Sequence, residues 1–284
     1  MKSRSYYSFM DEPRSESFHY LLGDSRTETE RLRAQAALWD PVSHALFDRI
    51  GVSPGWRVLE VGPGAGSLHA ELRRRVSGPV DAVEQSTAFA NALIERSRGD
   101  GLGDGAIWNM QLIDAPLESE SYDLVFARWV FLFLPDPLAH LRKLARAVKP
   151  GGLVALQDYF RDSFCLVPEP DDWSALVTAD HAFFASQGGD ASIGTRLPRF
   201  YEHVGLDLIE IVPTVKWGNP GSPVWNWLTT YFLGVLDEYT RFPPLTREAA
   251  HRIHDQWHDA TRHPASLLIA PTLLDVVGRK RLHG

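Results

Sequence analysis

A glycine-rich turn directly after a short β-rich run is the strongest chemical feature of this sequence. The run at 57–61 continues into Gly-Pro-Gly-Ala-Gly at 62–66, and helical sequence follows from Ser67. Glycines in a strand-to-helix turn let the backbone approach a ligand closely, because no side chain stands in the way. The N-terminus of the following helix favours a negatively charged group. The pattern therefore predicts a site for a nucleoside-containing cofactor.

Two acidic residues favour one class of cofactor over another. Glu84 ends the next β-rich run, at 80–83, where a carboxylate can bind two ribose hydroxyls. Glu60 lies two residues before the first glycine, where it would repel a pyrophosphate but suits a ligand with an ammonium and a sulfonium. The third glycine of a dinucleotide fingerprint would fall at Ser67. These details favour S-adenosylmethionine, and an NAD(P)-dependent oxidoreductase is the alternative.

Strand-like and helical segments alternate around this turn. Helical periodicity covers 24–50, where Asp40-Pro41 divides the segment into two helices. β-rich runs at 57–61, 80–83, 106–109, 122–127 and 153–157 alternate with helical sequence. Parallel pairing with helices on both faces follows from this alternation. We therefore expect an α/β fold with a Rossmann-like, doubly wound sheet.

The last third of the chain is less regular. Segments 206–212 and 267–277 have strand character, and about fifty residues rich in Trp and Tyr separate them. This arrangement predicts an antiparallel edge strand in a hairpin with an inserted helical lid. We expect a flexible tail at 1–16 and a single domain at 17–284. Its parts are a helical cap (17–50), a cofactor-binding core (51–160), and substrate-side helices with the edge hairpin (161–284).

Four ordered motifs give residues 20–160 a resemblance to class I S-adenosylmethionine-dependent methyltransferases of the small-molecule type with a helical N-terminal cap. The matching segments are 58–66, 80–86, 122–128 with 134–137, and 148–152. The stretch 20–35 also resembles the cap helix of one branch of these enzymes. The resemblance implies methyl transfer from S-adenosyl-L-methionine to a small molecule, with oxygen, nitrogen and carbon acceptors all open. The aromatic residues between 206–212 and 267–277 either pack as core or cover a partly apolar metabolite. A non-methylating cofactor-binding protein of the same fold stays open, because fold alone does not fix function.

The resemblance also assigns the cofactor contacts. The methionine moiety would lie against the glycine turn, the ribose on Glu84, and the adenine beside Gln85. Arg128 would contact the methionine end through its backbone. The family usually has Gly-Asp after the third strand, where this chain has Met110-Gln111, and Gln111 can still accept through its amide oxygen. Asp114 is the alternative there. The full set is Glu60, Gly62, Pro63, Gly64, Gly66, Glu84, Gln85, Gln111, Leu112 and Arg128.

The sequence assigns no catalytic residue. Methyl transfer mainly requires that two reactants be positioned and water excluded. An oxygen or nitrogen acceptor can also need a base. Candidates are Tyr20 in the cap, Asp158 beside Tyr159 at the end of the fifth strand, and His254 on an inserted helix. The helix histidines flank a buried stripe, so no metal site is expected.

Composition narrows the class of partner. The formal net charge is −7, which argues against nucleic acid. The single cysteine, Cys165, allows no intrachain disulfide and no thiolate metal cluster. The first fourteen residues lack an apolar signal core, and the most apolar stretch, 124–134, is too short to span a bilayer. We expect a cytoplasmic protein with a small-molecule substrate, no membrane or nucleic-acid partner, and a possible homo-oligomeric state.

Overall fold

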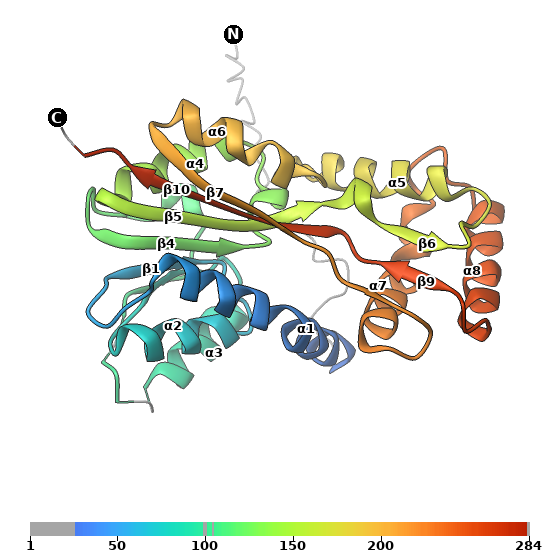
Figure 1. Cartoon of the computed structure of the whole chain (residues 1–284), viewed down its shortest axis with the longest axis horizontal. Coiled ribbons are helices and arrows are strands. Elements are labelled where there is room, and N and C mark those ends of the chain that lie inside the picture. The colour runs from blue at the N-terminus through green and yellow to red at the C-terminus, as the bar shows by residue number, and fades with distance from the viewer. Residues whose placement is uncertain (1–25, 99–100, 104, 283–284) are drawn as a thin grey trace, which may run out of the picture.

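A seven-stranded sheet forms the centre of the protein in a computed structural model that describes residues 26–98, 101–103 and 105–282, with side chains from Ala34 onward. The strand order is β3-β2-β1-β4-β5-β10-β7 (Figure 1). The strands are β1 (Val58–Val61), β2 (Asp81–Val83), β3 (Ile107–Trp108), β4 (Tyr122–Arg128), β5 (Val148–Phe160), β7 (Leu206–Thr214) and β10 (Thr272–Lys280). A second sheet has the order β6-β9-β8 and consists of β6 (Cys165–Val167), β8 (Trp217–Gly218) and β9 (Leu267–Ile269).

Strand directions confirm a mostly parallel, doubly wound sheet with one antiparallel strand. Strands β3, β2, β1, β4 and β5 pair in parallel. Strand β10 pairs antiparallel with both β5 and β7. The antiparallel strand therefore lies one place in from the edge, and β7 forms the edge itself.

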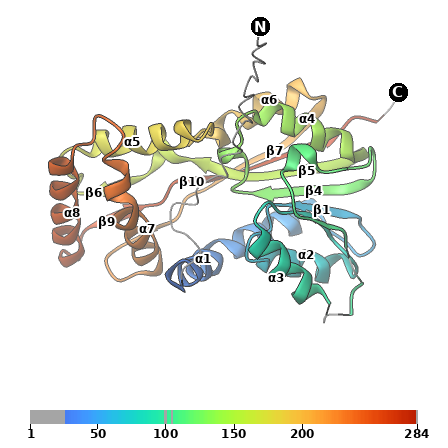
Figure 2. The same ribbon diagram turned by 180° about the vertical axis from the view of Figure 1, so that it is seen from behind.

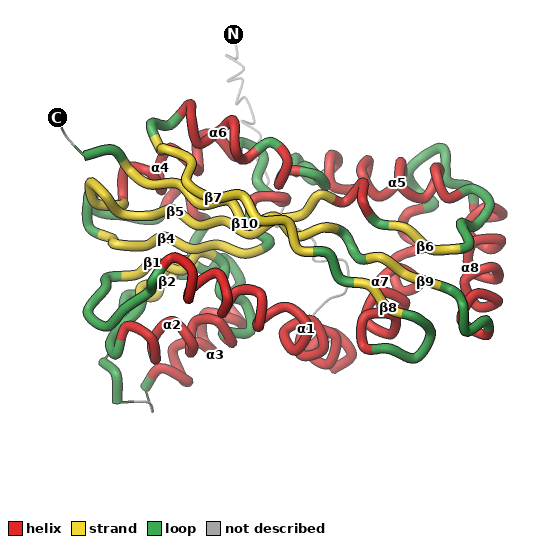
Figure 3. Tube along the Cα trace, in the orientation of Figure 1, coloured by secondary structure: helices red, strands yellow, loops and turns green. Residues whose placement is uncertain are grey.

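Helices pack on both faces of this sheet and beyond the carboxyl ends of its strands (Figures 1, 2 and 3). They are α1 (Arg26–Ile50), α2 (Ser67–Val76), α3 (Thr87–Ser97), α4 (Pro137–Ala147), α5 (Trp173–Ser186), α6 (Leu197–His203), α7 (Pro223–Tyr239) and α8 (Arg247–Arg262), with 3₁₀ turns η1 (Leu112–Asp114), η2 (Phe131–Phe133), η3 (Arg161–Ser163) and η4 (Ile193–Thr195). Helices α1, α2 and α3 lie on one side, and α4 and α6 on the other (Figures 1 and 2).

Successive side chains along a strand point to opposite faces of the sheet, because a strand has a two-residue period. Leu124 and Phe126 of β4 pack with Phe47 of α1 and with α2. Val125 and Ala127 of the same strand belong to the core on the opposite face. The sheet is therefore buried on both sides, which is typical of parallel sheets.

Helix α1 is continuous, so the predicted break at Asp40-Pro41 is wrong. Pro41 lies inside the helix and removes one backbone donor. Arg128 at the end of β4 donates to Asp40 Oδ1 (2.8 Å) and to Ser43 Oγ (2.9 Å). These tertiary contacts on either side of the proline stabilise the helical path, which local sequence signals do not reveal.

The predicted strand at 267–277 is two strands, β9 and β10, separated at Ala270 and Pro271. Proline lacks a donor for a strand ladder, which explains the interruption. Strand β9 belongs to the small sheet, whereas β10 enters the large one. The segment between β7 and β10 carries β8, α7 and α8. Together with α5, these helices lie beyond the carboxyl ends of β4 and β5 (Figure 3).

Within the described residues, no helix combines the length and apolar character that crossing a bilayer requires.

Candidate cofactor and substrate site

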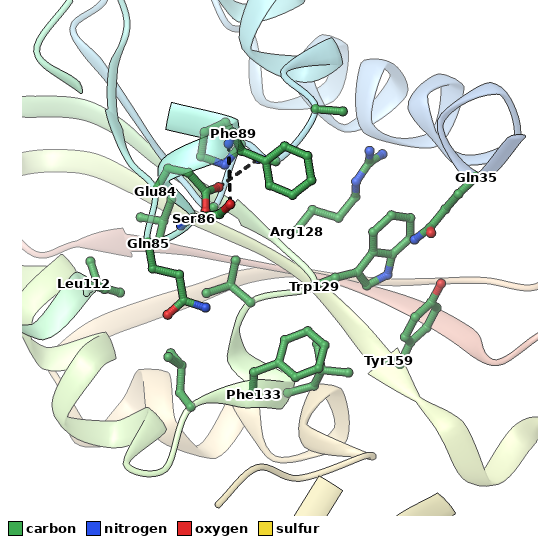
Figure 4. A pocket seen from close by; sticks show the side chains of 18 of the residues that line it. Gln35, Glu84, Gln85, Ser86, Phe89, Leu112, Arg128, Trp129, Phe133 and Tyr159 are labelled. Atoms are coloured by element: carbon green, nitrogen blue, oxygen red, sulfur yellow. Dashed lines mark hydrogen bonds between the residues drawn. The ribbon is translucent and has the colours of Figure 1, made fainter. Parts of the chain in front are cut away.

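A cavity of about 760 Å³ opens at the carboxyl ends of the parallel strands. This is the size expected of a small-molecule site, and such sheets bind ligands at this end. We call its first part the glycine-loop half, lined among others by Glu60, Gly62, Gly64, Glu84, Gln85, Gln111 and Leu112. The second part, the aromatic half, is lined among others by Trp129, Phe133, Tyr159, Phe184, Trp227, Tyr231 and Phe232. Figure 4 shows Glu84 and Gln85 on one side and Trp129 and Tyr159 on the other.

The three glycines of the turn have different reasons to be glycine. All have positive φ: 65° at Gly62, 53° at Gly64 and 79° at Gly66. A Cβ atom at Gly62 would lie 2.6 Å from Val130 Cγ2, and one at Gly66 would lie 2.9 Å from Leu93 Cδ1. At Gly64 nothing lies within 4 Å. Gly62 and Gly66 therefore permit close packing, while Gly64 presents bare backbone to the cavity.

Glu84 is held at the centre of the glycine-loop half. Its Oε2 accepts from the Gly64 amide (3.0 Å) and its Oε1 from the Ser86 amide (2.8 Å). Burial raises the pKa of this carboxyl, and the two amide donors act in the opposite direction. Each carboxylate oxygen has further acceptor capacity, so the group can receive two adjacent hydroxyls.

Asn109 positions this turn and was not predicted. Its Nδ2 donates to the carbonyl oxygens of Glu84 (2.9 Å) and Gln85 (3.1 Å). The residue ends the third β-rich run, so only the pairing of β2 with β3 brings it to Glu84. Further along, Gln111 lines the cavity at the start of η1, whereas Asp114 is exposed and does not line it.

Glu60 is buried and already has a protein partner. Its Oε2 lies 3.0 Å from Nδ1 of His69 on α2. His69 is also buried, and its Nε2 has no hydrogen-bond partner among the described residues. Glu60 lines the cavity, but its contact with a ligand ammonium stays a prediction.

Arg128 lines the cavity where the two halves meet, yet its guanidinium is engaged elsewhere. It donates to Asp40 and Ser43 of α1, and its Cζ lies 4.4 Å from the ring centre of Trp129. The side chain therefore fixes α1 and Trp129 at the cavity. A ligand contact through the Arg128 backbone stays a prediction.

Of the three predicted catalytic candidates, two lie away from the cavity. Tyr20 lies outside the described residues. Asp158 is fully buried behind the wall, where Oδ2 accepts from the Leu132 amide (3.2 Å) and Oδ1 from the Tyr159 amide (3.0 Å). Burial raises its pKa to about 7. Asp158 holds η2 in place and does not line the cavity.

His254 was one candidate for a base, and in the structure it lies away from the cavity. Its imidazole is on the exposed side of α8, beside Asp255 and His258. It does not line the cavity, because the buried stripe of α8 is formed by Ile253 and Trp257. Among the described residues, no group of three or more His, Cys, Asp or Glu side chains could hold a metal ion.

His140 is a cavity residue that the sequence did not indicate. Its Nδ1 lies 2.6 Å from the carbonyl oxygen of Asp136, one helical turn earlier. A carbonyl can only accept, so Nδ1 carries the hydrogen and Nε2 keeps its lone pair in the neutral ring. The sequence indicated candidates at strand ends, in the cap and in the inserted lid, and none at the start of α4.

Comparisons with known proteins agree with this geometry. Residues 59–156 match a protein family described as "Methyltransferase domain". The chain is 27% identical to the methyltransferase GfsG of Streptomyces halstedii over 192 residues, or 65% of this chain and 67% of that protein. Matches to the first curated relatives cover between half and two thirds of those proteins' length.

Two solved structures share the fold. The [4+2]-cyclase SpnF superposes with a TM-score of 0.56 at 16% identity, covering 86% of this chain and 82% of that one. The phosphoethanolamine N-methyltransferase 2 of Haemonchus contortus, solved with S-adenosylhomocysteine, has a TM-score of 0.52 at 16% identity. It covers 86% of this chain and 53% of that one.

The glycine turn, the carboxylate at the end of β2, the strand order and the matched segment lead to one assignment. Residues 59–156 match a methyltransferase domain, and the relatives and the sheet topology support a class I S-adenosylmethionine-dependent methyltransferase.

Proposed function

We propose that this protein transfers the methyl group of S-adenosylmethionine to a small, partly apolar molecule bound in the aromatic half of the cavity. The observation that supports this most is that one continuous cavity joins Glu84 and the glycine turn to an aromatic wall. A cofactor on Glu84 and an acceptor against the aromatic rings would then lie in the same cavity.

The glycine-loop half fits the cofactor by its chemistry. Glu84 would take the two ribose hydroxyls, and the open backbone at Gly64 would leave room for the amino-acid end. Leu112 would pack against the adenine, with the Gln111 amide at its edge. When bound, S-adenosylmethionine supplies a methyl group on a positively charged sulfur, and this sulfur becomes a neutral thioether when the methyl group is transferred.

The chain's own residues would mainly orient the acceptor and exclude water. Trp129 is stacked on Tyr159 with ring centres 5.5 Å apart, and Trp39 packs edge-on against both. Burial raises the pKa of Tyr159 well above its usual range, so its hydroxyl stays a donor. His140 also lines the cavity, and its neutral ring, with the hydrogen on Nδ1, could accept a proton at Nε2 from a hydroxyl or amine acceptor.

The test is mass spectrometry of a metabolite pool incubated with the protein and methyl-deuterated S-adenosylmethionine. A product that gains the labelled methyl group, together with stoichiometric S-adenosylhomocysteine, is the expected result. Cofactor binding without any conversion would instead indicate a non-methylating member of this fold. A nicotinamide-dependent activity, seen as an absorbance change at ~340 nm, would contradict the proposal.

The division at 17–50, 51–160 and 161–284, a cytoplasmic location and a homo-oligomeric state stay proposals beside this function.

A further inference from the structure

Arg161 is a buried cation in the aromatic half of the cavity. It begins η3, directly after β5, and only 6% of its side chain is exposed. Its Nε donates to Asp180 Oδ2 at 2.7 Å, and its Nη2 donates to Asp180 Oδ1. The Tyr239 hydroxyl donates to the same Oδ1 at 2.7 Å. Both carboxylate oxygens of Asp180 therefore already have a protein donor.

One nitrogen of the Arg161 guanidinium, Nη1, takes no part in the pair with Asp180. The pair with Asp180 uses Nε and Nη2, so Nη1 lies on the side turned away from that carboxylate. Among the hydrogen bonds of the described residues, none involves Nη1. Arg161 itself lines the cavity, with the rings of Phe184, Tyr231 and Phe232 at 5.0, 5.6 and 5.6 Å from its Cζ.

Other unsatisfied donors lie in the same wall. The Tyr159 hydroxyl and the indole nitrogens of Trp129 and Trp227 are buried without a hydrogen-bond partner in the described part of the chain. Indole N–H can only donate. The carboxylates among the cavity-lining residues are Glu60 and Glu84, both in the glycine-loop half. The described residues of the aromatic half thus offer donors and aromatic surface, and none of them supplies a carboxylate to pair with a cation.

Stability alone does not explain the Arg161–Asp180 pair. Burying two charges costs several kcal/mol, and apolar residues of similar volume often serve stability equally well or better. Buried donors without a partner are likewise unfavourable. Both features are expected where a ligand completes the hydrogen bonds.

We propose that the methyl acceptor is an apolar, oxygen-bearing molecule without positive charge, and that Arg161 Nη1 binds one of its carbonyl or acidic oxygens. This assignment of substrate class rests on the proposed function. Rings such as Phe184, Tyr231 and Phe232 can hold an ammonium group. Here the Arg161 guanidinium already occupies that position, so a cationic amine would meet repulsion. Arg161 is thereby a specificity-determining residue.

The test uses three probes with one naphthalene body: 2-acetonaphthone, 2-naphthoate and 2-naphthylmethylamine, which is protonated at neutral pH. Each is titrated calorimetrically into protein saturated with S-adenosylhomocysteine, which fills the glycine-loop half. We expect the ketone and the carboxylate to bind at least about tenfold more tightly than the amine. Equal or tighter binding of the amine, or no binding of either oxygenated probe, would overturn the assignment.

Paired variants link this selectivity to Arg161. Arg161→Met together with Asp180→Asn avoids a buried unpaired carboxylate and keeps an acceptor for Tyr239. It should lose at least about tenfold in affinity for both oxygenated probes, and not for the amine. Arg252→Met, which removes an exposed pair with Asp172, is the matched control.

Unchanged affinity in the folded double variant would refute the role of Arg161. If that variant does not fold, Arg161→Lys must show the same loss. Failure of S-adenosylhomocysteine to bind the wild-type protein would instead count against the proposed function, so the two failures can be told apart.

Discussion

Gly64 and Glu84 are joined by a hydrogen bond that closes the glycine turn onto the carboxylate. One acidic side chain thus orders the loop and faces the cavity. The same side chain is buried, so its interaction with ribose hydroxyls would take place largely shielded from water. Cofactor binding should therefore depend on Glu84 more than on other acidic residues nearby.

Replacing Glu84 tests this dependence. Glu84→Ala should weaken S-adenosylhomocysteine binding by about 100-fold, and Glu84→Gln, which keeps one acceptor oxygen, by about 10-fold. Calorimetric titration measures both. Glu95→Gln, an exposed change on the adjoining helix α3, is the control and should leave affinity unchanged. Near-normal affinity in Glu84→Ala would show that Glu84 does not bind the ribose hydroxyls.

Gly64 provides a second test at the residue scale, because strain and ligand contact can be separated. Gly64→Ala should lose about 1–2 kcal/mol of stability from its positive φ and also lose cofactor affinity. Gly55 also has a positive φ, 85°, and no atom lies within 4 Å of a Cβ added there, but Gly55 does not line the cavity. Gly55→Ala is therefore the matched control. It should lose stability alone. Equal cofactor affinity in the two variants, measured by titration, would contradict a ligand at Gly64.

The residues that the sequence predicted share a local signal. Gly62, Gly64 and Glu84 lie at the ends of strands whose patterns are visible in the chain. Asn109 and Arg161 act through partners that sequence spacing does not disclose. Asn109 reaches Glu84 across a strand pairing, and Arg161 needs Asp180 from α5. Tertiary contact, and not residue type, marks them as site residues.

At the scale of elements, α1 closes one side of the cavity and is fixed by Arg128. Side chains Asp40 and Arg128 are only 16% and 10% exposed, so their pair is shielded from solvent. Gln35 and Ala36 of the same helix line the cavity. The attachment of α1 to β4 should therefore control access to the aromatic half.

Breaking this attachment has a measurable consequence. Asp40→Ala should cost about 1–3 kcal/mol and speed hydrogen–deuterium exchange in the peptide covering 34–43. Asp48→Ala on the same helix removes a pair with Arg75 in which the Asp48 side chain is 68% exposed, and should cost below about 1 kcal/mol. Identical exchange in the two variants would show that the pair does not hold α1.

Elements with a clear period were predictable, and their exceptions have physical reasons. The runs that became β1, β2, β4 and β5 alternate with helices as expected. Pro41 suggested a helix break that the Arg128 contacts override. The strand expected at 267–277 is divided near Pro271, and its parts join different sheets. Such outcomes depend on contacts with distant segments, which local patterns do not contain.

For the molecule as a whole, Asp158 should make stability depend on pH. Its pKa of about 7 is above that of an unfolded aspartate. The folded state therefore binds the proton more tightly, and the associated stability is present below pH ~4 and lost as pH rises through about 7. Other buried acids titrate as well, so the comparison must be made against a variant at this site.

The comparison is Asp158→Asn against wild type in urea unfolding between pH ~5 and ~8. Relative to wild type, the variant should gain up to about 1.4 kcal/mol per pH unit until pH ~7 and then level off. Loss of one amide acceptor adds an offset that does not vary with pH. A difference in stability that is flat with pH would show that Asp158 does not titrate in this range.

Whole-molecule architecture was predictable as far as the sheet and its antiparallel strand. The helices beyond the sheet were predicted as an insertion, but their orientation was not. Trp227 and Tyr231 of α7 face the cavity, whereas His254 and His258 of α8 face outward. This difference arises because α7 packs against α1 and the cavity, while α8 packs behind it on α5 and α7. Only the assembled layers show which helix contacts a ligand.

A crystal structure of the protein with S-adenosylhomocysteine would show directly how the cofactor is bound. We expect the two ribose hydroxyls to lie on the Glu84 carboxylate and the sulfur to point toward Trp129 and Tyr159. A nucleoside bound in the aromatic half, or a ribose without contact to Glu84, would contradict this expectation.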